Sequence, residues 1–162
     1  MNADGSGKKQ LASGNWSPAW SPDGERIAYT ADWQGTPELR VVNVNGTERT
    51  RLTGKSPSRF WSNDSQPAWS PKGERIAFVS LRGSAYRICL LDLNDSERRC
   101  LRTEPSSDHS PPTWSPDGTH LAFASGGDDG DPEIYAMNAA DGSEITNLTE
   151  NPARDVAPAW RP

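Results

Sequence analysis

Apolar side chains in this chain alternate with polar ones over short segments, and the alternation returns at a nearly constant interval. In residues 26–30, Ile27 and Tyr29 share one face of an extended segment, because successive side chains of a strand point to opposite sides. The same alternation returns twice, in Ile76 with Phe78 and in Leu121 with Phe123. This period of two predicts β-strands rather than helices.

A turn motif precedes each alternating segment and defines a repeat. It reads PAWSPDGERIAY in residues 18–29, PAWSPKGERIAF in 67–78 and PTWSPDGTHLAF in 112–123, and it begins again as PAWRP in 158–162. Successive tryptophans of the motif are about 45–49 residues apart, a period typical of the blades of β-propellers. The repeat therefore predicts a row of similar units.

Four strand signals, separated by turn residues, fill each repeat. The first is the Ala-Trp-Ser element, the second follows the Pro-Asp-Gly turn, and the last two lie on either side of a further turn such as Asn45-Gly46. Four-stranded antiparallel units of this length are blades. We predict an all-β fold, a β-propeller fragment of about three four-stranded antiparallel blades with partial blades at both ends. The expected boundaries are 1–14 (end of a blade), 15–53, 64–103 and 109–149 (blades), and 155–162 (first strand of the next blade).

The repeated tryptophans predict how the blades pack. Trp20, Trp69 and Trp114 stand at the same place in each first strand. Large aromatic side chains supply the contact area that packed sheets need. We expect all three to be buried between blades.

The repeat also resembles a known family. PAWSPDGERIA in residues 18–28, EIYAMN in 133–138 and NLT in 147–149 are similar to the TolB-type β-propeller repeat. The resemblance implies a propeller, periplasmic or secreted, that most often acts as a binding scaffold. Residues 1–6 match residues 137–143 inside the third repeat, so we interpret the chain as the C-terminal part of a longer propeller. Lys72, Thr113 and the cysteine-bearing hairpin depart from the family pattern without affecting the expected fold. The sequence shows no signal peptide.

Charge and composition narrow the class of partner. The 162 residues carry a formal net charge of −5, so the phosphate backbone of a nucleic acid would be repelled. No apolar run reaches the length of a membrane span, so no membrane insertion is expected. We therefore expect a protein or a small-molecule ligand as partner.

Motifs for catalysis are missing from the sequence. It contains no Gly-x-Ser-x-Gly nucleophile elbow. His109 and His120 are its only histidines, so a catalytic triad is difficult to build from this sequence. We expect no catalytic residues and a non-enzymatic scaffold. The alternatives are the propeller part of a larger hydrolase or lyase whose catalytic residues lie elsewhere, and a structural half-ring that self-assembles, with a homodimer completing the ring.

One side of the expected blades carries the longer loops. The turns after the first and third strands are tight and share one side, whereas the loops between strands two and three and the connections between blades share the other. The second side carries the candidate residues for binding a ligand or partner: Trp16, Trp33, Arg59, Phe60, Trp61 and His109. Exposed aromatic residues with polar neighbours on a rigid scaffold are typical of binding surfaces. Packing of Trp16 and Trp61 against the core is an equally open alternative.

Three aspartates take similar places before the repeated tryptophans, namely Asp64, Asp108 and Asp155. If the repeat brings them together near the axis, a calcium ion or another cation can bridge them. We favour the other interpretation, in which each aspartate caps the turn that enters the first strand. No other cofactor is expected.

The two cysteines are placed to face each other. If Asn94-Asp95 is a two-residue turn, Cys89 and Cys100 lie directly opposite on neighbouring strands. Counted outward from that turn they form a hydrogen-bonded pair, with Cα atoms about 5.5 Å apart. That separation allows a disulfide bond.

Overall fold

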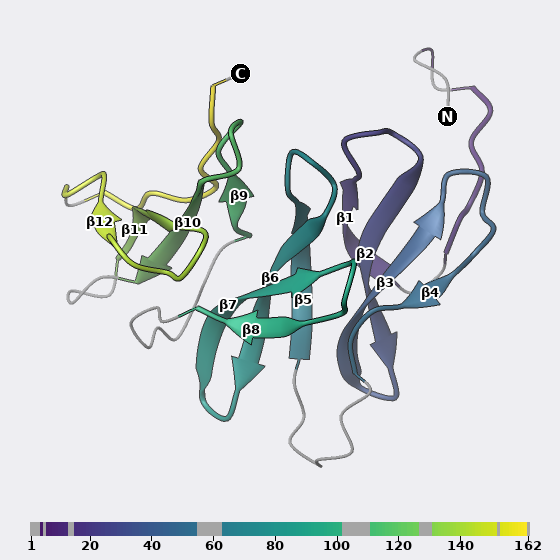
Figure 1. Cartoon of the computed structure of the whole chain (residues 1–162), viewed down its shortest axis with the longest axis horizontal. Coiled ribbons are helices and arrows are strands. Elements are labelled where there is room, and N and C mark those ends of the chain that lie inside the picture. The colour runs from purple at the N-terminus through teal and green to yellow at the C-terminus, as the bar shows by residue number, and fades with distance from the viewer. Residues whose placement is uncertain are drawn as a thin grey trace.

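The structure is a computed structural model that describes residues 4, 6–12, 15–54, 63–101, 111–126, 131–151 and 153–161. In these ranges the chain forms β-strands and no helix, and the strands make three four-stranded antiparallel sheets (Figure 1). Each sheet is a meander in which neighbours in sequence are neighbours in space. The predicted all-β class and the four-stranded units are confirmed.

The sheets follow the repeat, and we call them blades one, two and three. Blade one contains β1 (Asn15–Trp20), β2 (Arg26–Trp33), β3 (Thr36–Asn43) and β4 (Thr50–Arg51). Blade two contains β5 (Asn63–Trp69), β6 (Arg75–Arg82), β7 (Ala85–Asp92) and β8 (Arg98–Cys100). Blade three contains β9 (Thr113–Trp114), β10 (His120–Gly126), β11 (Pro132–Asn138) and β12 (Thr146–Asn147).

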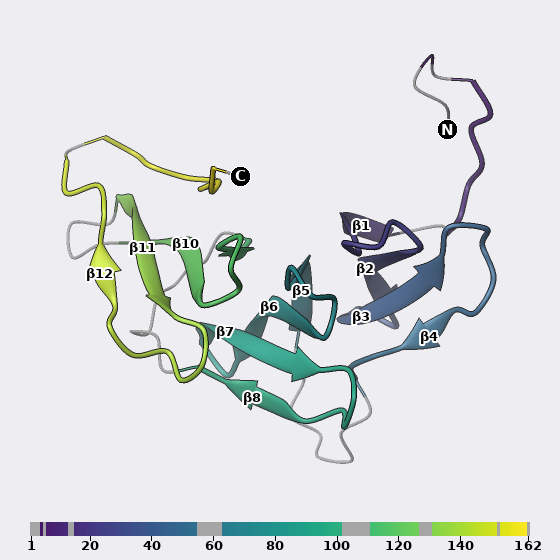
Figure 2. The ribbon, with the colours of Figure 1, turned by 45° about the horizontal axis from the view of Figure 1, so that its top comes forward.

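The blades stand side by side along an arc. Figure 2 shows β1 and β5 on the inner side of this arc and β4, β8 and β12 on its outer side. Two apolar clusters join the blades. One combines Leu39 and Val41 of blade one with Ile76 and Phe78 of blade two, among others, and a second links blade two to blade three. The core therefore lies between sheets rather than inside one of them.

A tryptophan and a main-chain carbonyl make the same contact at each junction, which we call the tryptophan–carbonyl contact. The indole Nε1 of Trp69 donates to the carbonyl of Ala19 at 3.1 Å, and Trp114 donates to Ala68 at 3.1 Å. Trp160 donates to Thr113 at 3.2 Å in the same way. Arginines of the preceding blade cover the buried rings, with Arg26 4.8 Å from the Trp69 centroid and Arg75 5.1 Å from that of Trp114.

Burial of the repeated tryptophans depends on a preceding blade. Trp69 is 8% exposed and Trp114 is 7% exposed, as the sequence predicts. The prediction is wrong for Trp20, which is 62% exposed. Trp20 pairs with Ile27, so its side chain lies on the face of blade one that is turned away from blade two. Position in the repeat fixes the direction of this side chain, whereas only a neighbouring sheet can bury it.

The turn between the first two strands of a blade is held by a serine and an aspartate. The Ser21 hydroxyl donates to Asp23 Oδ1 at 2.5 Å and accepts from the backbone N–H of Arg26 at 2.9 Å. Asp23 Oδ1 also accepts from the N–H of Glu25 at 2.9 Å. Gly24 takes a φ of 72°, where a glycine is favoured. These hydrogen bonds, first that from the Ser21 hydroxyl, hold the pKa of Asp23 below its usual value.

Blade two lacks the aspartate of this turn, and the difference gives a prediction. Lys72 takes its place, so the Ser70 hydroxyl accepts from the N–H of Arg75 at 3.0 Å without a carboxylate to receive its own proton. We expect Lys72→Asp to raise the free energy of unfolding by about 1 kcal/mol, because it adds hydrogen bonds to a charged acceptor. Urea unfolding at pH 7 measures the change. Lys72→Ala is the control, and an equal gain in both variants would contradict the explanation.

The same turn in blade three gives a pH dependence. Hydrogen bonds from the Ser115 hydroxyl, and then from Thr119, lower the pKa of Asp117 from its usual value to about 2. A lowered folded-state pKa means that the folded protein binds fewer protons, so this stabilisation is complete above about pH 4 and is lost as the pH falls towards 2. We expect Asp117→Asn to flatten the fall in stability between pH 4 and pH 2. Urea unfolding across that range tests this, and an unchanged slope would refute it.

The structure confirms that Cys89 lies opposite Cys100, but it corrects the predicted hydrogen-bonding class of this cross-strand pair. Cys89 pairs with Cys100, and the two sulfur atoms form a disulfide. The N–H of Asp92 donates to Glu97, so the loop has four residues rather than two and is centred on the same pair, Asn94-Asp95. This loop leaves the register unchanged and shifts the hydrogen-bonded pairs by one position. Cys89 and Cys100 are therefore a non-hydrogen-bonded pair, with Cα atoms 3.9 Å apart instead of the expected 5.5 Å.

The corresponding hairpin of blade one also differs from the expected two-residue turn. The N–H of Gly46 donates to the carbonyl of Asn43 at 2.7 Å, and the N–H of Asn43 donates to Thr47 at 3.0 Å. These bonds enclose the three residues 44–46. Gly46 has a φ of 89°, so it takes the left-handed position that closes a loop of this length.

The segments before and after the blades pack against the outermost sheets. Residues 6–12 and 153–161 form no strand. Leu11 and Ala12 contact the face of blade one that carries Tyr29, and Arg49 Nη2 donates to the Leu11 carbonyl at 2.7 Å. The residue 153–161 segment carries Trp160, whose indole repeats the tryptophan–carbonyl contact on blade three.

Candidate functional site

The hairpin ends between second and third strands lie on one side of the molecule, opposite the tight turns. In Figure 1 the β2–β3 and β6–β7 hairpins point to the bottom and the β1–β2 and β5–β6 turns to the top. We call the former side the long-loop face. It carries Trp33, which is 49% exposed, and Trp16 in β1 is 42% exposed. The other predicted residues, Arg59, Phe60, Trp61 and His109, lie outside the described residues.

Trp33 is the last residue of β2 and not part of a loop, because β2 extends three residues beyond the expected 26–30. It pairs with Thr36 across the hairpin. Tyr29 pairs with Arg40, and Arg40 pairs with Arg51 of β4. Since side chains alternate along a strand, these pairs place Trp33, Arg40 and Arg51 on the same face of blade one.

A buried carboxylate holds the two arginines. Glu38 is 1% exposed and pairs with Ala31, on the same face. Its Oε1 accepts from Arg40 Nε at 2.7 Å, and its Oε2 lies 2.6 Å from Arg51 Nη2. The Trp33 ring covers both guanidinium groups, with centroid distances of 5.4 Å to Arg40 and 6.0 Å to Arg51. We call these four residues the Trp33 cluster.

Main-chain carbonyls fix Arg51 further. Its Nε donates to the carbonyl of Thr53 at 2.9 Å and its Nη2 to that of Gly54 at 2.7 Å. A Cβ at residue 54 would lie 2.5 Å from Arg51 Nη2 and 2.8 Å from Glu38 Oε2, and Gly54 has a φ of +85°. An added Cβ would displace these two side-chain ends, and the left-handed φ favours glycine, so Gly54 suits the ion pairs as they stand.

The arrangement is a rigid, partly exposed platform with an excess of positive charge. Two guanidinium groups face one carboxylate, which leaves one positive charge unmatched within the Trp33 cluster. The side chains of Arg40 and Arg51 are 28% and 32% exposed, so solvent reaches both. An indole beside charged hydrogen-bond donors can bind a group that is flat or apolar on one side and anionic on the other.

Glu38, Arg40 and Arg51 were not among the candidates from the sequence. The glutamate recurs in blade three as Glu133, which is 6% exposed and accepts from the Thr149 hydroxyl at 2.5 Å. There, however, register places other residues at the positions of the two arginines, namely Tyr135 and Asn147. A recurring acidic residue at the start of strand three was the available signal, but the arginines follow only from strand register.

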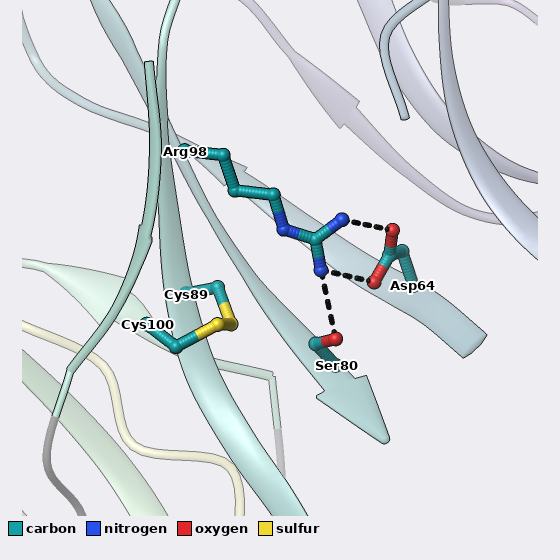
Figure 3. The surroundings of a disulfide bond; sticks show 5 residues. All are labelled: Asp64, Ser80, Cys89, Arg98 and Cys100. Atoms are coloured by element: carbon teal, nitrogen blue, oxygen red, sulfur yellow. Dashed lines mark hydrogen bonds and ion pairs between the residues drawn. A yellow bond between two sulfur atoms is a disulfide. The ribbon is translucent and has the colours of Figure 1, made fainter. Parts of the chain in front are cut away.

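Asp64 lies against an arginine rather than against other carboxylates. Its carboxylate accepts hydrogen bonds from Arg98 Nη1 at 2.8 Å and from Arg98 Nη2 at 2.7 Å. Arg98 Nη2 also donates to the Ser80 hydroxyl at 2.9 Å (Figure 3). Arg98 comes from β8 and crosses the Phe78 ring at 4.9 Å to reach β5. The carboxylate of Asp64 thus has a cationic partner within its own blade.

The other two aspartates do not join Asp64 within the described part of the chain. Asp155 accepts from Asn151 Nδ2 at 2.6 Å, and Asp108 lies outside the described residues. The ranges that the structure describes hold no group of three or more potential metal ligands.

Further arginines lie near Arg98 on blade two. The pKa of Arg82, at the end of β6, is lowered by burial and by the neighbouring positive charges of Arg98 and Arg87, with Asp64 acting in the opposite direction. Positive charge therefore gathers on the long-loop side of blade two as well as in the Trp33 cluster, in a chain whose net charge is −5.

Blades of four antiparallel strands, arranged along an arc with their first strands inward, define the β-propeller class. Residues 64–162 match the family model of the TolB beta propeller domain, and the chain belongs to this family.

Solved structures agree with this class, and one curated relative is similar to part of the chain. TolB from Acinetobacter baumannii superposes with a TM-score of 0.77 at 26% identity, over 91% of this chain and 36% of that one. A putative TolB from Agrobacterium tumefaciens gives 0.72 at 22% identity, over 85% of this chain and 50% of that one. A dipeptidyl-peptidase 5 of Porphyromonas endodontalis is 37% identical over 70 residues, which are 40% of this chain and 10% of that protein. The chain thus spans half or less of the length of each relative.

Proposed function

We propose that this chain is a non-enzymatic binding propeller that engages a protein or small-molecule partner through its long-loop face. The observation that carries the proposal is the Trp33 cluster. Its indole is 49% exposed, although it rests on two guanidinium groups that a buried carboxylate holds in place. Large exposed aromatic and arginine side chains on a rigid scaffold are the residues that most often carry binding energy.

The proposal includes a periplasmic or extracellular location. Disulfides persist in oxidising compartments and are rare in the cytosol, and the Cys89–Cys100 disulfide supports such a location. Resemblance to TolB propellers supports the same compartment. Within the described ranges, the chain has no helix that is both long and apolar enough to span a membrane.

A second candidate is the propeller part of a larger peptidase. It rests on the 37% identity to a dipeptidyl-peptidase 5 over 70 residues. In that case the long-loop face would guide a peptide towards catalytic residues outside this chain. Because both candidates leave this chain without catalytic residues of its own, hydrolysis of chromogenic dipeptides is assayed on the protein purified from its source cells. Hydrolysis that co-purifies with the protein would favour the peptidase, and its absence would favour the binding propeller.

Self-association is a third candidate and an alternative to partner binding at the Trp33 cluster, because the Trp33 cluster lies on the same face of blade one as Trp20. Trp20 is 62% exposed on the face of blade one that is turned away from blade two, and Leu148 is 55% exposed on blade three. Leu148 corresponds to Leu52 and Leu101, which pack against the following blade. The two end faces thus carry complementary halves of one junction, and we propose a head-to-tail homodimer. A monomer mass in light scattering at high micromolar concentration would contradict this dimer.

The decisive experiment on the long-loop face is site-specific photo-crosslinking. A benzoylphenylalanine at Gln34, at the tip of the β2–β3 hairpin, is expected to give a discrete adduct in an extract of the source cells. The same group at Lys72, in a tight turn on the opposite face, is the matched control. The partner is then identified and titrated in purified form against the unmodified chain and Trp33→Ala.

Two results would overturn the proposed face. One is an adduct at residue 72 without one at residue 34. The other is equal affinity of Trp33→Ala and the unmodified chain for the purified partner. Because Trp33 is half exposed at the end of a strand, its replacement should leave the β-sheet circular dichroism unchanged.

A further inference from the structure

The Trp33 cluster leaves hydrogen-bond donors directed away from its buried carboxylate. Glu38 engages Arg40 through Nε and Nη2 and Arg51 through Nη2. The remaining contacts of Arg51 are those of Nε and Nη2 with the carbonyls of Thr53 and Gly54. Within the described residues, neither Arg40 Nη1 nor Arg51 Nη1 has a hydrogen bond. Each Nη1 carries two N–H groups, so donors from two guanidinium groups remain for an added acceptor.

We propose that this cluster binds the C-terminal residue of a peptide, with its carboxylate on the two arginines and its apolar side chain on Trp33. The proposal rests on the long-loop face being the binding face and specifies the chemistry recognised there. It begins from charge, since two guanidinium groups against one carboxylate leave a single unmatched positive charge. A monovalent carboxylate matches that charge, whereas a phosphate dianion would exceed it in a chain of net charge −5.

The neighbouring indole narrows the choice among carboxylates. The guanidinium carbons of Arg40 and Arg51 lie 5.4 Å and 6.0 Å from the Trp33 centroid. A carboxylate bound to these arginines therefore lies close enough to the indole for both to contact the same amino-acid residue, since successive Cα atoms are about 3.8 Å apart. A C-terminal residue carries a carboxylate and a side chain on the same Cα. An internal aspartate or glutamate carries its charge at the end of its side chain and has no second side chain to place on the indole.

The cluster is also organised before a peptide arrives. Glu38 is 1% exposed, and the close contact at Gly54 leaves no space for a Cβ beside Arg51 and Glu38. Arg51 is fixed by two carbonyls in addition to the carboxylate. Little side-chain entropy is then lost on binding, because the guanidinium groups are already ordered. A single terminal residue can therefore give measurable binding without the rest of the peptide.

A pair of small probes tests the proposal on the unmodified chain. The probes are N-acetyl-phenylalanine, with a free carboxylate, and N-acetyl-phenylalaninamide, which has the same side chain without the charge. Nitrogen-15 NMR follows the indole N–H of Trp33 and the Nε–H groups of Arg40 and Arg51, which the hydrogen bonds to Glu38 and Thr53 protect. We expect the acid to shift all three signals with half-saturation at about 1 mM, and the amide to bind about ten-fold more weakly.

Two further probes distinguish other sources of a carboxylate. N-acetyl-aspartate amide represents an internal acidic side chain, and galacturonic acid represents an acidic sugar. Stronger binding of either one than of N-acetyl-phenylalanine would overturn the assignment to a peptide C-terminus. Equal binding of the acid and the amide would overturn the role of the arginines. The probes can also fail to bind while crosslinks at residue 34 still form; then the carboxylate proposal fails and the long-loop face stands.

Variants assign the effect to the cluster. Arg51→Gln and Trp33→Ala should each weaken binding of N-acetyl-phenylalanine at least about ten-fold. Arg154→Gln, which removes an exposed arginine of the C-terminal segment, should bind as the unmodified chain does. An equal loss in Arg154→Gln would show that the effect is general charge attraction and would overturn the site. Because the probe pair is measured on the unmodified chain, unfolding of a variant does not remove the test.

Discussion

Replacing Trp69 with alanine is expected to lower the free energy of unfolding by about 3–5 kcal/mol, the range for removing a large aromatic side chain from a core. Trp69 is 8% exposed, packs in the cluster between blades one and two, and donates its indole N–H to the Ala19 carbonyl at 3.1 Å. The substitution removes the apolar contact and leaves that carbonyl without its indole donor. Urea unfolding followed by far-ultraviolet circular dichroism measures the loss.

The chain contains its own control for this experiment. Trp20 occupies the same position of the repeat but is 62% exposed. Trp20→Ala should therefore change the free energy of unfolding by no more than about 0.5 kcal/mol. Similar losses in the two variants would show that the tryptophan acts through the local strand rather than through the junction between blades.

The second large effect is expected at Asp64. Asp64→Asn should lower the free energy of unfolding by about 3 kcal/mol, at the lower end of the range for breaking a buried ion pair. The side chain of Asp64 is 0% exposed, and the substitution leaves the Arg98 guanidinium without its two-point partner inside the blade. The lower end applies because the side chain of Arg98 is 21% exposed and can partly reach water.

A double substitution separates the pair from general packing. Arg98→Leu alone should be as harmful as Asp64→Asn, because it leaves the Asp64 carboxylate buried without its cation. Asp64→Leu combined with Arg98→Leu should recover part of the loss, since replacing both members of a buried pair by apolar residues is often close to neutral. If the double variant loses the sum of the two single losses, the ion pair contributes no coupling energy.

Most of the fold followed from local sequence signals. The Pro-Asp-Gly turns and the alternation of Ile27 with Tyr29 place two strands in each blade, because these signals act over a few residues. Burial of Trp20 was predicted wrongly, because it depends on a neighbouring sheet and not on the residues around it. The hydrogen-bonding class of Cys89 and Cys100 was wrong for a similar reason. Turn length alters that class without altering the register.

The candidate site was harder to predict from the sequence than the fold. Trp33 was identified from its polar surroundings, but its position on a strand, above Arg40 and Arg51, depends on strand register between β2, β3 and β4. Asp64 was considered together with Asp108 and Asp155 because all three precede a tryptophan. Its actual partner, Arg98, is 34 residues away in sequence and reaches it across the whole blade. Such long-range pairs leave no local signature.

The tryptophan–carbonyl contact has a consequence for cooperativity. Each contact joins a blade only to the next one, so the stability of the chain behaves as a sum of blade terms and nearest-neighbour terms. Within the described structure, blade two packs against both blade one and blade three. Blades one and three each pack against blade two, and the two apolar clusters do not join them to each other directly. Amide protons of β6 and β7 should therefore exchange most slowly with solvent, and opening should start at the outer blades. Losing Trp69 would uncouple blade one, which could then open while the rest stays folded.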